Sequence, residues 1–376
     1  MLKLAVVGLG RMGLSHLAII NSHPRVQVQA VCDSAGYLLD VFGKYTGART
    51  YADFDEMTRE VELDAVLIAT PSSLHARVVK AALERNLHVF CEKPFCLDTR
   101  EGRELGRLAA EKGVVNQVGY HNRFVGAFQE VKRLLDLKAI GKVTHALAEA
   151  YGPVVLQPKG STWRTRRTEG GGCMFDYAAH PINLMNWYFG APHGVGGSVL
   201  GQVFSQDTDD QVLSTMYFPD GKAAQLSVNW SDDSCRKMST KVTIWGTGGK
   251  IYADRQECQV YLRATEDIPP GYKQGWNVRY TTELTEPVWF YLRGEEYSAQ
   301  LDHFVRCIEG SDAAANLSSF QDALITDTVI EMMIADAAKG PSLTTTDTAP
   351  QAAKGKRRFL QFFFDGVRKS PRLDAS

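Results

Sequence analysis

Short apolar runs alternate with longer amphipathic segments over the first 120 residues. The runs are LKLAVVG at 2–8, VQVQAVC at 26–32, AVLIAT at 65–70, HVFC at 88–91 and VVNQVG at 114–119. Residues 73–85 and 99–112 carry apolar side chains at intervals of three and four, as surface helices do. Strands that alternate with such helices predict a parallel sheet covered on both faces, which is a Rossmann-type α/β domain.

The pattern changes after about residue 124. The runs KVTHALAEAY, DDQVLSTMYF, AAQLSVNW and KVTIWG alternate polar with apolar, aromatic or β-branched residues, and turn sequences such as PDG and GTGG separate them. This alternation predicts an antiparallel sheet. Helical patterns follow at 297–309 and 319–339. We therefore divide the chain into an α/β domain at 1–123 and an α+β domain at 124–340.

Residues 341–376 form a third segment. A polar stretch leads to an aromatic cluster flanked by basic residues, KRRFLQFFFDGVRK. Basic and aromatic residues together can contact a membrane surface or a partner protein. We favour packing on the same domain or on another subunit, because exposed aromatic clusters promote aggregation. Membrane contact by this tail is not expected.

Composition excludes several classes of protein. The chain has 376 residues with a net charge of −1, so there is no overall attraction to nucleic acids or anionic membranes. The N-terminal apolar run is too short for a signal peptide, and no stretch approaches the roughly 18 apolar residues of a membrane span. The seven cysteines contain no CxxC pair, which argues against a zinc or redox site. We expect a cytoplasmic protein with reduced thiols and no metal.

The sequence GLGRMG, from Gly8 through Gly10, Arg11 and Met12 to Gly13, matches GxGxxG. It follows the first predicted strand and opens a helical pattern. Glycines there allow a tight turn and close approach to a pyrophosphate, and the helix N-terminus offers unpaired N–H groups to the anion. This context predicts dinucleotide binding.

Asp33 ends the second predicted strand, where an acidic side chain can bond a ribose 2′-hydroxyl. The alternative is a capping or turn residue. Ser34 beside it brings no positive charge for a 2′-phosphate, so we predict NAD in preference to NADP.

Later strand ends should line the same crevice, because ligands of open α/β sheets bind at the carboxyl ends of the strands. This nominates Thr70 and Pro71, and then Glu92 and Lys93. His75 follows in the same loop and could contact the ribose, although a lone histidine on a helix is at least as often a surface or core residue.

Lys93 is the first candidate for catalysis. It ends the fourth predicted strand in VFCEKPF, where it could give a proton or a hydrogen bond to a substrate oxygen. Pro94 would fix the turn and Glu92 would balance the charge. The alternative is an ion pair at the surface.

Asp176 and His180 follow a triple glycine and precede an apolar helix. Because they are four residues apart, they share one face of a helix, and the carboxylate could orient the imidazole as a general base. Pro181 lacks the N–H that would bond Tyr177, so we expect a regular helix to begin only near it.

A cationic loop precedes the triple glycine. It carries Lys159, Arg164, Arg166 and Arg167 beside Trp163. Arginine binds carboxylates and phosphates in a bidentate manner, so the loop could hold a phosphate, a uronate or the diphosphate of a nucleotide sugar. A solvated loop or a subunit contact is the alternative.

GLGRMG, CEKPF, VGYHNRF at 118–124 and GGGCMFDYAAHPINLMNWYFG together resemble the Gfo/Idh/MocA family of NAD(P)-dependent oxidoreductases, named after glucose-fructose oxidoreductase, inositol dehydrogenase and a rhizopine-catabolism protein. The resemblance covers about residues 1–340. It implies a Rossmann domain and a second domain with a large, mainly antiparallel sheet. The open face of that sheet commonly makes subunit contacts, so a homodimer or homotetramer is expected.

The resemblance also assigns roles to residues. It implies that Lys93 lies at the nicotinamide, that Asp176 is its partner in substrate binding, and that His180 accepts the proton of the hydroxyl being oxidised. Tyr120, Trp163, Arg164 and Asn183 join Arg166 and Arg167 as predicted substrate residues. Asn183 departs from the pattern, since many relatives have an aspartate there, and the tail after 340 has no counterpart in it.

These observations predict hydride transfer between NAD and a hydroxyl-bearing carbon of a sugar, sugar phosphate, nucleotide sugar or cyclitol. Two alternatives remain. One is a glycosidase of the same fold that oxidises its substrate transiently with bound NAD. The other is a dinucleotide-binding regulator without catalysis, against which the joint presence of Lys93, Asp176 and His180 argues.

Overall fold

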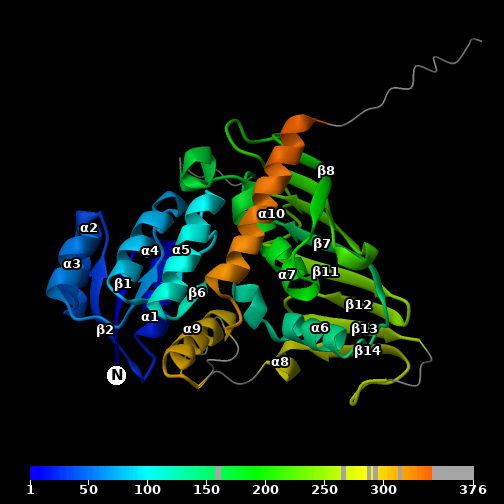
Figure 1. Cartoon of the computed structure of the whole chain (residues 1–376), viewed down its shortest axis with the longest axis horizontal. Helices are drawn as coiled ribbons and strands as arrows, with labels where there is room; N and C mark the ends of the chain where they lie inside the picture. The colour runs from blue at the N-terminus through cyan, green and yellow to red at the C-terminus, as the bar shows by residue number, and fades with distance from the viewer. Residues whose placement is uncertain (157–161, 264–267, 286–288, 291–294, 312–315, 341–376) are drawn as a thin grey trace, which may run out of the picture. The chain divides into compact units, whose positions relative to one another are not determined.

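The computed structural model describes residues 1–156, 162–263, 268–285, 289–290, 295–311 and 316–340 (Figure 1). Residues 1–340 form one compact unit. The tail at 341–376 and Lys159 lie outside the described residues, so the expectations for them stay predictions. No helix in the described ranges is long and apolar enough to cross a bilayer.

The first sheet has six parallel strands in the order β3-β2-β1-β4-β5-β6. The strands are β1 (Leu2–Val7), β2 (Val26–Cys32), β3 (Arg49–Tyr51), β4 (Ala65–Ile68), β5 (His88–Cys91) and β6 (Asn116–Val118). This confirms the predicted Rossmann-type sheet. Strand β3 was not predicted, because three residues are too few to show a periodic pattern.

Helices cover both faces of this sheet. In chain order they are α1 (Arg11–Ile20), α2 (Gly36–Thr46), α3 (Phe54–Glu60), α4 (His75–Glu84) and α5 (Thr99–Lys112). Helix α9 (Glu295–Ile308) returns from the far end of the chain to pack with α1 on one face, where the ring centroids of Phe304 and Phe90 are 5.9 Å apart. The chain beyond residue 124 therefore also contributes to the core of the first sheet.

The second sheet has eight strands in the order β14-β13-β12-β11-β7-β10-β9-β8. They are β7 (Val143–Tyr151), β8 (Gly194–Gly201), β9 (Gln211–Tyr217), β10 (Ala223–Asn229), β11 (Ser239–Gly246), β12 (Gly249–Ala253), β13 (Glu257–Leu262) and β14 (Gly275–Tyr280). All neighbours are antiparallel except β7 and β10, which run parallel. The predicted, mainly antiparallel sheet is confirmed, although β8, β12, β13 and β14 were not among the strands predicted.

Three helices pack on one face of the second sheet (Figure 1). They are α6 (Gly126–Asp136), α7 (Ala179–Phe189) and α10 (Phe320–Lys339). Buried and exposed residues alternate along the strands, as one-sided packing requires. The opposite face exposes Leu213, Tyr217, Tyr261 and Trp276.

Short helical turns and one further helix connect these elements. They are η1 (Ser72–Leu74), η2 (His121–Phe124), η3 (Trp163–Thr165), η4 (Arg167–Glu169), the π-helical turn η5 (Met174–Ala178), η6 (Pro219–Gly221) and α8 (Thr281–Leu284). Ser319 and Asp322 form a reciprocal capping box at the start of α10. This fixes the beginning of the helix that joins the two sheets (Figure 1).

Candidate active site

The glycine-rich turn joins β1 to α1 and has the shape that a dinucleotide needs. Gly8 has φ +91°, and a Cβ there would lie 2.7 Å from the carbonyl carbon of Ala69. A Cβ at Gly13 would lie 1.8 Å from the carbonyl oxygen of Gly8, so helix α1 can approach β1 this closely only without side chains. No side chain caps α1 at Gly10, which leaves its first N–H groups available to a pyrophosphate.

Asp33 lies at the edge of this turn. Its Oδ2 accepts a hydrogen bond from the N–H of Leu9 at 2.5 Å, and its Oδ1 accepts one from Ala35 at 2.8 Å. The carboxylate therefore fixes the glycine-rich turn, as the capping alternative expected. A carboxylate has about four lone-pair sites, so capacity for a ribose hydroxyl remains. The ribose contact stays a prediction.

His75 belongs to the core and not to the cofactor surface. It is 1% exposed, its Nδ1 lies 2.8 Å from the carbonyl oxygen of Pro94, and its Nε2 lies 3.0 Å from that of Thr70. Burial lowers the pKa of this imidazole, and a neutral imidazole donates from only one nitrogen. Both nitrogens face protein oxygens in this structure, so the geometry offers no support for the ribose contact, which stays a prediction. Thr70 and the exposed Pro71 remain candidates at this strand end.

Glu92 points to a partner inside the protein. Its Oε1 accepts a hydrogen bond from Nε2 of His16 at 2.5 Å, and its Oε2 accepts one from the N–H of Lys93 at 3.2 Å. Burial raises its pKa, but the hydrogen bond from His16 and the charge of Lys93 outweigh burial, so the net pKa is lowered. Glu92 therefore bonds helix α1, and its predicted cofactor contact stays a prediction. The Lys93–Pro94 peptide bond that follows is cis.

Lys93 contacts a residue that lies 83 positions further along the chain. Its Nζ donates to Oδ1 of Asp176 at 3.0 Å and to the carbonyl oxygen of the same residue at 2.8 Å. Nε of Arg164 donates to Oδ2 of Asp176 at 2.8 Å, and the guanidinium lies 4.8 Å from the ring centroid of Trp163. Burial raises the pKa of Asp176, but Lys93 and Arg164 outweigh it and the net pKa is lowered. The carboxylate therefore stays ionised between two cations.

Asp176 does not orient His180, contrary to the expectation from their spacing. Residues 174–178 form a π-helical turn, whose wider winding takes residues four apart out of alignment. Both oxygens of Asp176 face cations, while the His180 ring lies edge-on to His121, with centroids 4.8 Å apart, and to Tyr120 at 6.2 Å. Helix α7 begins at Ala179, close to Pro181 as expected.

The electrostatic environment keeps His180 neutral. It is 3% exposed, and its Nδ1 is buried without a hydrogen-bond partner among the described residues. Burial lowers the pKa of this imidazole well below its usual range, and the positive charges of Lys93 and Arg255 lower the pKa further. A buried, neutral imidazole beside a lysine can accept a proton from a bound hydroxyl.

Two of the predicted substrate residues serve the protein interior. Oδ1 of Asn183 accepts from Nε of Arg123 at 2.7 Å, and its Nδ2 donates to Oγ1 of Thr326 at 3.0 Å. Both ends of Asn183 are thus engaged within the protein, and its predicted contact with substrate stays a prediction. Tyr120 is 1% exposed and touches the site only through its ring beside His180.

The cations of the loop are largely balanced by carboxylates. Arg164 bonds Asp176, and Nη1 of Arg166 lies 2.8 Å from Oε1 of Glu169. Arg167 is exposed. Two of the three described arginines are therefore already paired with carboxylates.

Two residues that the sequence did not reveal support this site. His16 holds Glu92, and Oδ2 of Asp209 accepts from the N–H of Met174 at 2.6 Å, at the start of the turn that carries Asp176. Each lies more than 30 residues from its partner in the chain. His16 lies among apolar residues of helix α1, and no motif in the sequence marks it as a site residue.

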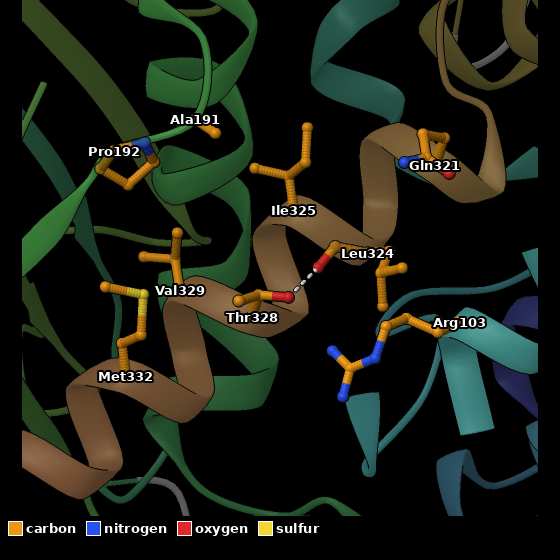
Figure 2. A pocket seen from close by; sticks show the side chains of 9 residues that line it. All are labelled: Arg103, Ala191, Pro192, Gln321, Leu324, Ile325, Thr328, Val329 and Met332. Atoms are coloured by element: carbon orange, nitrogen blue, oxygen red, sulfur yellow. Dashed lines mark hydrogen bonds between the residues drawn. The ribbon is translucent and has the colours of Figure 1, made fainter. Parts of the chain in front are cut away.

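A separate hollow lies on helix α10, away from these residues. Figure 2 shows its lining, with the hydroxyl of Thr328 bonded to the carbonyl oxygen of Leu324. Its volume is about 270 Å³, and its lining residues are Arg103, Ala191, Pro192, Gln321, Leu324, Ile325, Thr328, Val329 and Met332. None of them is a predicted site residue, so this hollow is not the candidate active site.

The parallel sheet and its glycine-rich turn define a dinucleotide-binding protein. Residues 2–120 match the model described as an oxidoreductase family with an NAD-binding Rossmann fold, and residues 128–252 match the GFO/IDH/MocA C-terminal domain. The chain belongs to the Gfo/Idh/MocA oxidoreductase family. This confirms the resemblance noted in the sequence and the prediction of NAD as the cofactor.

Named relatives support this membership. The chain is 32% identical to the rhizopine catabolism protein MocA of Rhizobium meliloti, across 89% of this chain and 93% of that protein. It is 25% identical to scyllo-inositol 2-dehydrogenase (NAD(+)) of Bacillus subtilis, across 81% and 86%. The crystal structure of GenD2 from gentamicin A biosynthesis, in complex with NAD, is similar with a TM-score of 0.74 and 26% identity, covering 90% of this chain and 95% of that one.

Proposed function

We propose that this protein transfers a hydride between NAD and a hydroxyl-bearing carbon of a sugar or cyclitol. The observation that carries the proposal is the contact of the Lys93 ammonium with Asp176, at the carboxyl end of β5 and beside a neutral, buried His180. In a Rossmann fold that end of the sheet faces the bound dinucleotide. The named dehydrogenase among the relatives acts on a cyclitol, which supports the substrate class.

Lys93 and His180 have different roles at the substrate hydroxyl: Lys93 bonds its oxygen and His180 accepts its proton. Two hydrogen bonds to Asp176 engage two of the three ammonium protons of Lys93, which leaves one for the substrate oxygen. His180 takes the hydroxyl proton, because its lowered pKa keeps the imidazole neutral. Bound NAD would supply the acceptor for the hydride that leaves the carbon. Glycines 8, 10 and 13, with Arg11 and Met12, would hold its pyrophosphate, and Asp33 its ribose.

A neutral substrate suits the loop better than an anionic one. Arg164 and Arg166 are each paired with a carboxylate, so among the described arginines of the loop only Arg167 could bind a phosphate or uronate without breaking such a pair. Arg164 acts instead on Asp176, and Trp163 offers a flat apolar surface to a sugar ring. We therefore favour a free sugar or cyclitol over a sugar phosphate or nucleotide sugar.

The exposed face of the second sheet supports a homodimer or homotetramer. Tyr217, Tyr261 and Trp276 are exposed on that face, with Tyr261 beside Trp276 at 5.4 Å between ring centroids, and exposed large apolar side chains are typical of contact surfaces. Light scattering of the purified chain tests this, since a monomer at micromolar concentration would contradict it.

The test is to incubate the purified protein with NAD and a panel of free, phosphorylated and nucleotide-linked sugars and cyclitols while following absorbance of the reduced nicotinamide. We expect NADH to accumulate with one or more neutral polyols. A glycosidase that oxidises its substrate transiently would release product without accumulating NADH. A regulator would bind NADH, detected by fluorescence, and turn over nothing in either direction.

A further inference from the structure

Two buried carboxylates flank Lys93. The carboxylate of Asp176 accepts a hydrogen bond from the Lys93 ammonium at 3.0 Å. Glu92 precedes Lys93 in the chain, and its carboxylate bonds the backbone N–H of Lys93, at 3.2 Å, instead of the ammonium. The side chain of Glu92 is 10% exposed and that of Asp176 is 7% exposed. Both charges are thus shielded from water, and each gains by pairing with a cation. The positive charge of Lys93 helps to lower the pKa of Glu92, so the lysine is within electrostatic reach of both.

His16 bonds one of the two carboxylates, that of Glu92. It projects from helix α1 with a fully buried side chain, and its Nε2 lies 2.5 Å from Oε1 of Glu92. A carboxylate only accepts, so the imidazole must be the donor. The ring is held edge-on by Phe90 at 5.4 Å and by Tyr297 at 6.1 Å. Glu92 therefore has a fixed donor that is not the lysine.

We propose that His16 is a positioning residue that engages Glu92 and thereby leaves the Lys93 ammonium to Asp176. The proposal rests on the proposed function, in which Lys93 must point to the substrate oxygen. Without His16, Glu92 would be a buried carboxylate without a side-chain donor. It would then take the Lys93 ammonium as its partner, since an unpaired buried charge is strongly unfavourable.

The variant His16→Phe tests this, because it keeps an aromatic ring against Phe90 and Tyr297 and removes only the donor. We expect kcat to fall about 10-fold or more, with the NADH dissociation constant changed by less than about 3-fold. His16→Gln restores a donor and should recover most of the loss. His23→Phe is the matched control: it removes the bond of Nε2 to Asp302, 3.0 Å long and also buried, and should lower stability without changing kcat.

The double variant His16→Phe with Glu92→Gln gives the sharpest result. If His16 acts by keeping Glu92 from pairing with the Lys93 ammonium, a neutral residue at position 92 makes His16 unnecessary. The His16→Phe substitution should then change kcat by less than about 3-fold in the Glu92→Gln background. An equal loss in both backgrounds would overturn the proposal, because His16 would then act independently of Glu92.

Crystal structures of the same variants separate this inference from the proposed function. In His16→Phe, Nζ of Lys93 should leave Oδ1 of Asp176, and in His16→Gln it should stay there. An unmoved lysine contradicts the proposal whatever the kinetics show. If the unaltered protein oxidises no polyol, the proposed function fails, while the position of Nζ still tests the role of His16.

Discussion

The Nζ atom of Lys93 lies 3.0 Å from Oδ1 of Asp176, and this contact joins the end of strand β5 to the π-helical turn before α7. The two residues are 83 positions apart in the chain. The lysine follows a strand of the first sheet, and the aspartate lies between strands β7 and β8 of the second sheet. Their pairing therefore links the two sheets at the candidate site.

Replacing Lys93 by methionine removes the charge and keeps most of the side-chain volume. Asp176 would still be paired with Arg164, so we expect the fold to persist. The rate should fall by about 10²- to 10⁴-fold, the range for loss of a positioned proton donor. Steady-state kinetics together with fluorescence titration of NADH check this. Equal losses in cofactor affinity and in rate would mean that the lysine is structural.

Asp33→Asn tests the cofactor preference. The amide keeps an oxygen for the N–H of Leu9 but loses the charge that we expect the ribose hydroxyl to meet. Losing a hydrogen bond to a charged group costs about 1.5 to 3 kcal/mol, so the NADH dissociation constant should rise about 10- to 100-fold. The preference for NADH over NADPH should fall at the same time. An unchanged preference, at an unchanged melting temperature, would leave Asp33 with only its role in the turn.

Asn183→Ala separates substrate binding from stability. Because Asn183 links Arg123 to Thr326 in the interior, its loss leaves buried groups without partners. We expect a destabilisation of about 1 to 3 kcal/mol and a nearly unchanged KM for the polyol. Denaturant unfolding and initial-rate measurements provide the two quantities. A large rise in KM without destabilisation would restore the substrate contact that the sequence predicted.

Asp327 makes stability depend on pH. Burial raises the pKa of this carboxyl to about 7, although hydrogen bonds from Cys96 and Phe95 lower it. The folded state therefore binds the proton more tightly than the unfolded chain, whose aspartate titrates near 3.9. Stability from this group is fully present below about pH 4 and declines until about pH 7, by roughly 3 to 4 kcal/mol in all.

Asp327→Asn removes this proton-binding group. The difference in melting temperature, variant minus unaltered protein, should increase as the pH is raised from 4 to 8. Calorimetry of both proteins at the same pH values measures this difference. If the melting temperatures of the two proteins changed by the same amount at every pH in this range, Asp327 would have to be ionised in the folded protein.

Local patterns were sufficient for most of the framework. Strand β2 and helix α5 begin and end where the apolar periodicity predicted, since each is long enough to show its period and is bounded by turn residues. Strand β3 has only three residues, which is too few to show a period. The parallel pairing of β7 with β10 depends on contacts between distant parts of the chain, which no local pattern reports.

The candidate site was predictable in its motifs and less so in its partners. Lys93 meets Asp176 as the family resemblance implied, but His180 is not held by Asp176, because a π-helical turn changes the spacing. His75, Glu92 and Asn183 were expected to face ligands and instead bond within the protein. A polar residue near a strand end looks the same in the sequence whether it faces a ligand or a distant side chain.

Hydride transfer itself is the central claim, and deuterium labelling tests it most directly. A polyol identified in the substrate panel is deuterated at the carbon that carries the reacting hydroxyl and is incubated with NAD and the protein. We predict that mass spectrometry finds one deuterium in the reduced nicotinamide, in step with ketone formation. Product that forms while the deuterium appears only in water, with none in the nicotinamide, would contradict the account.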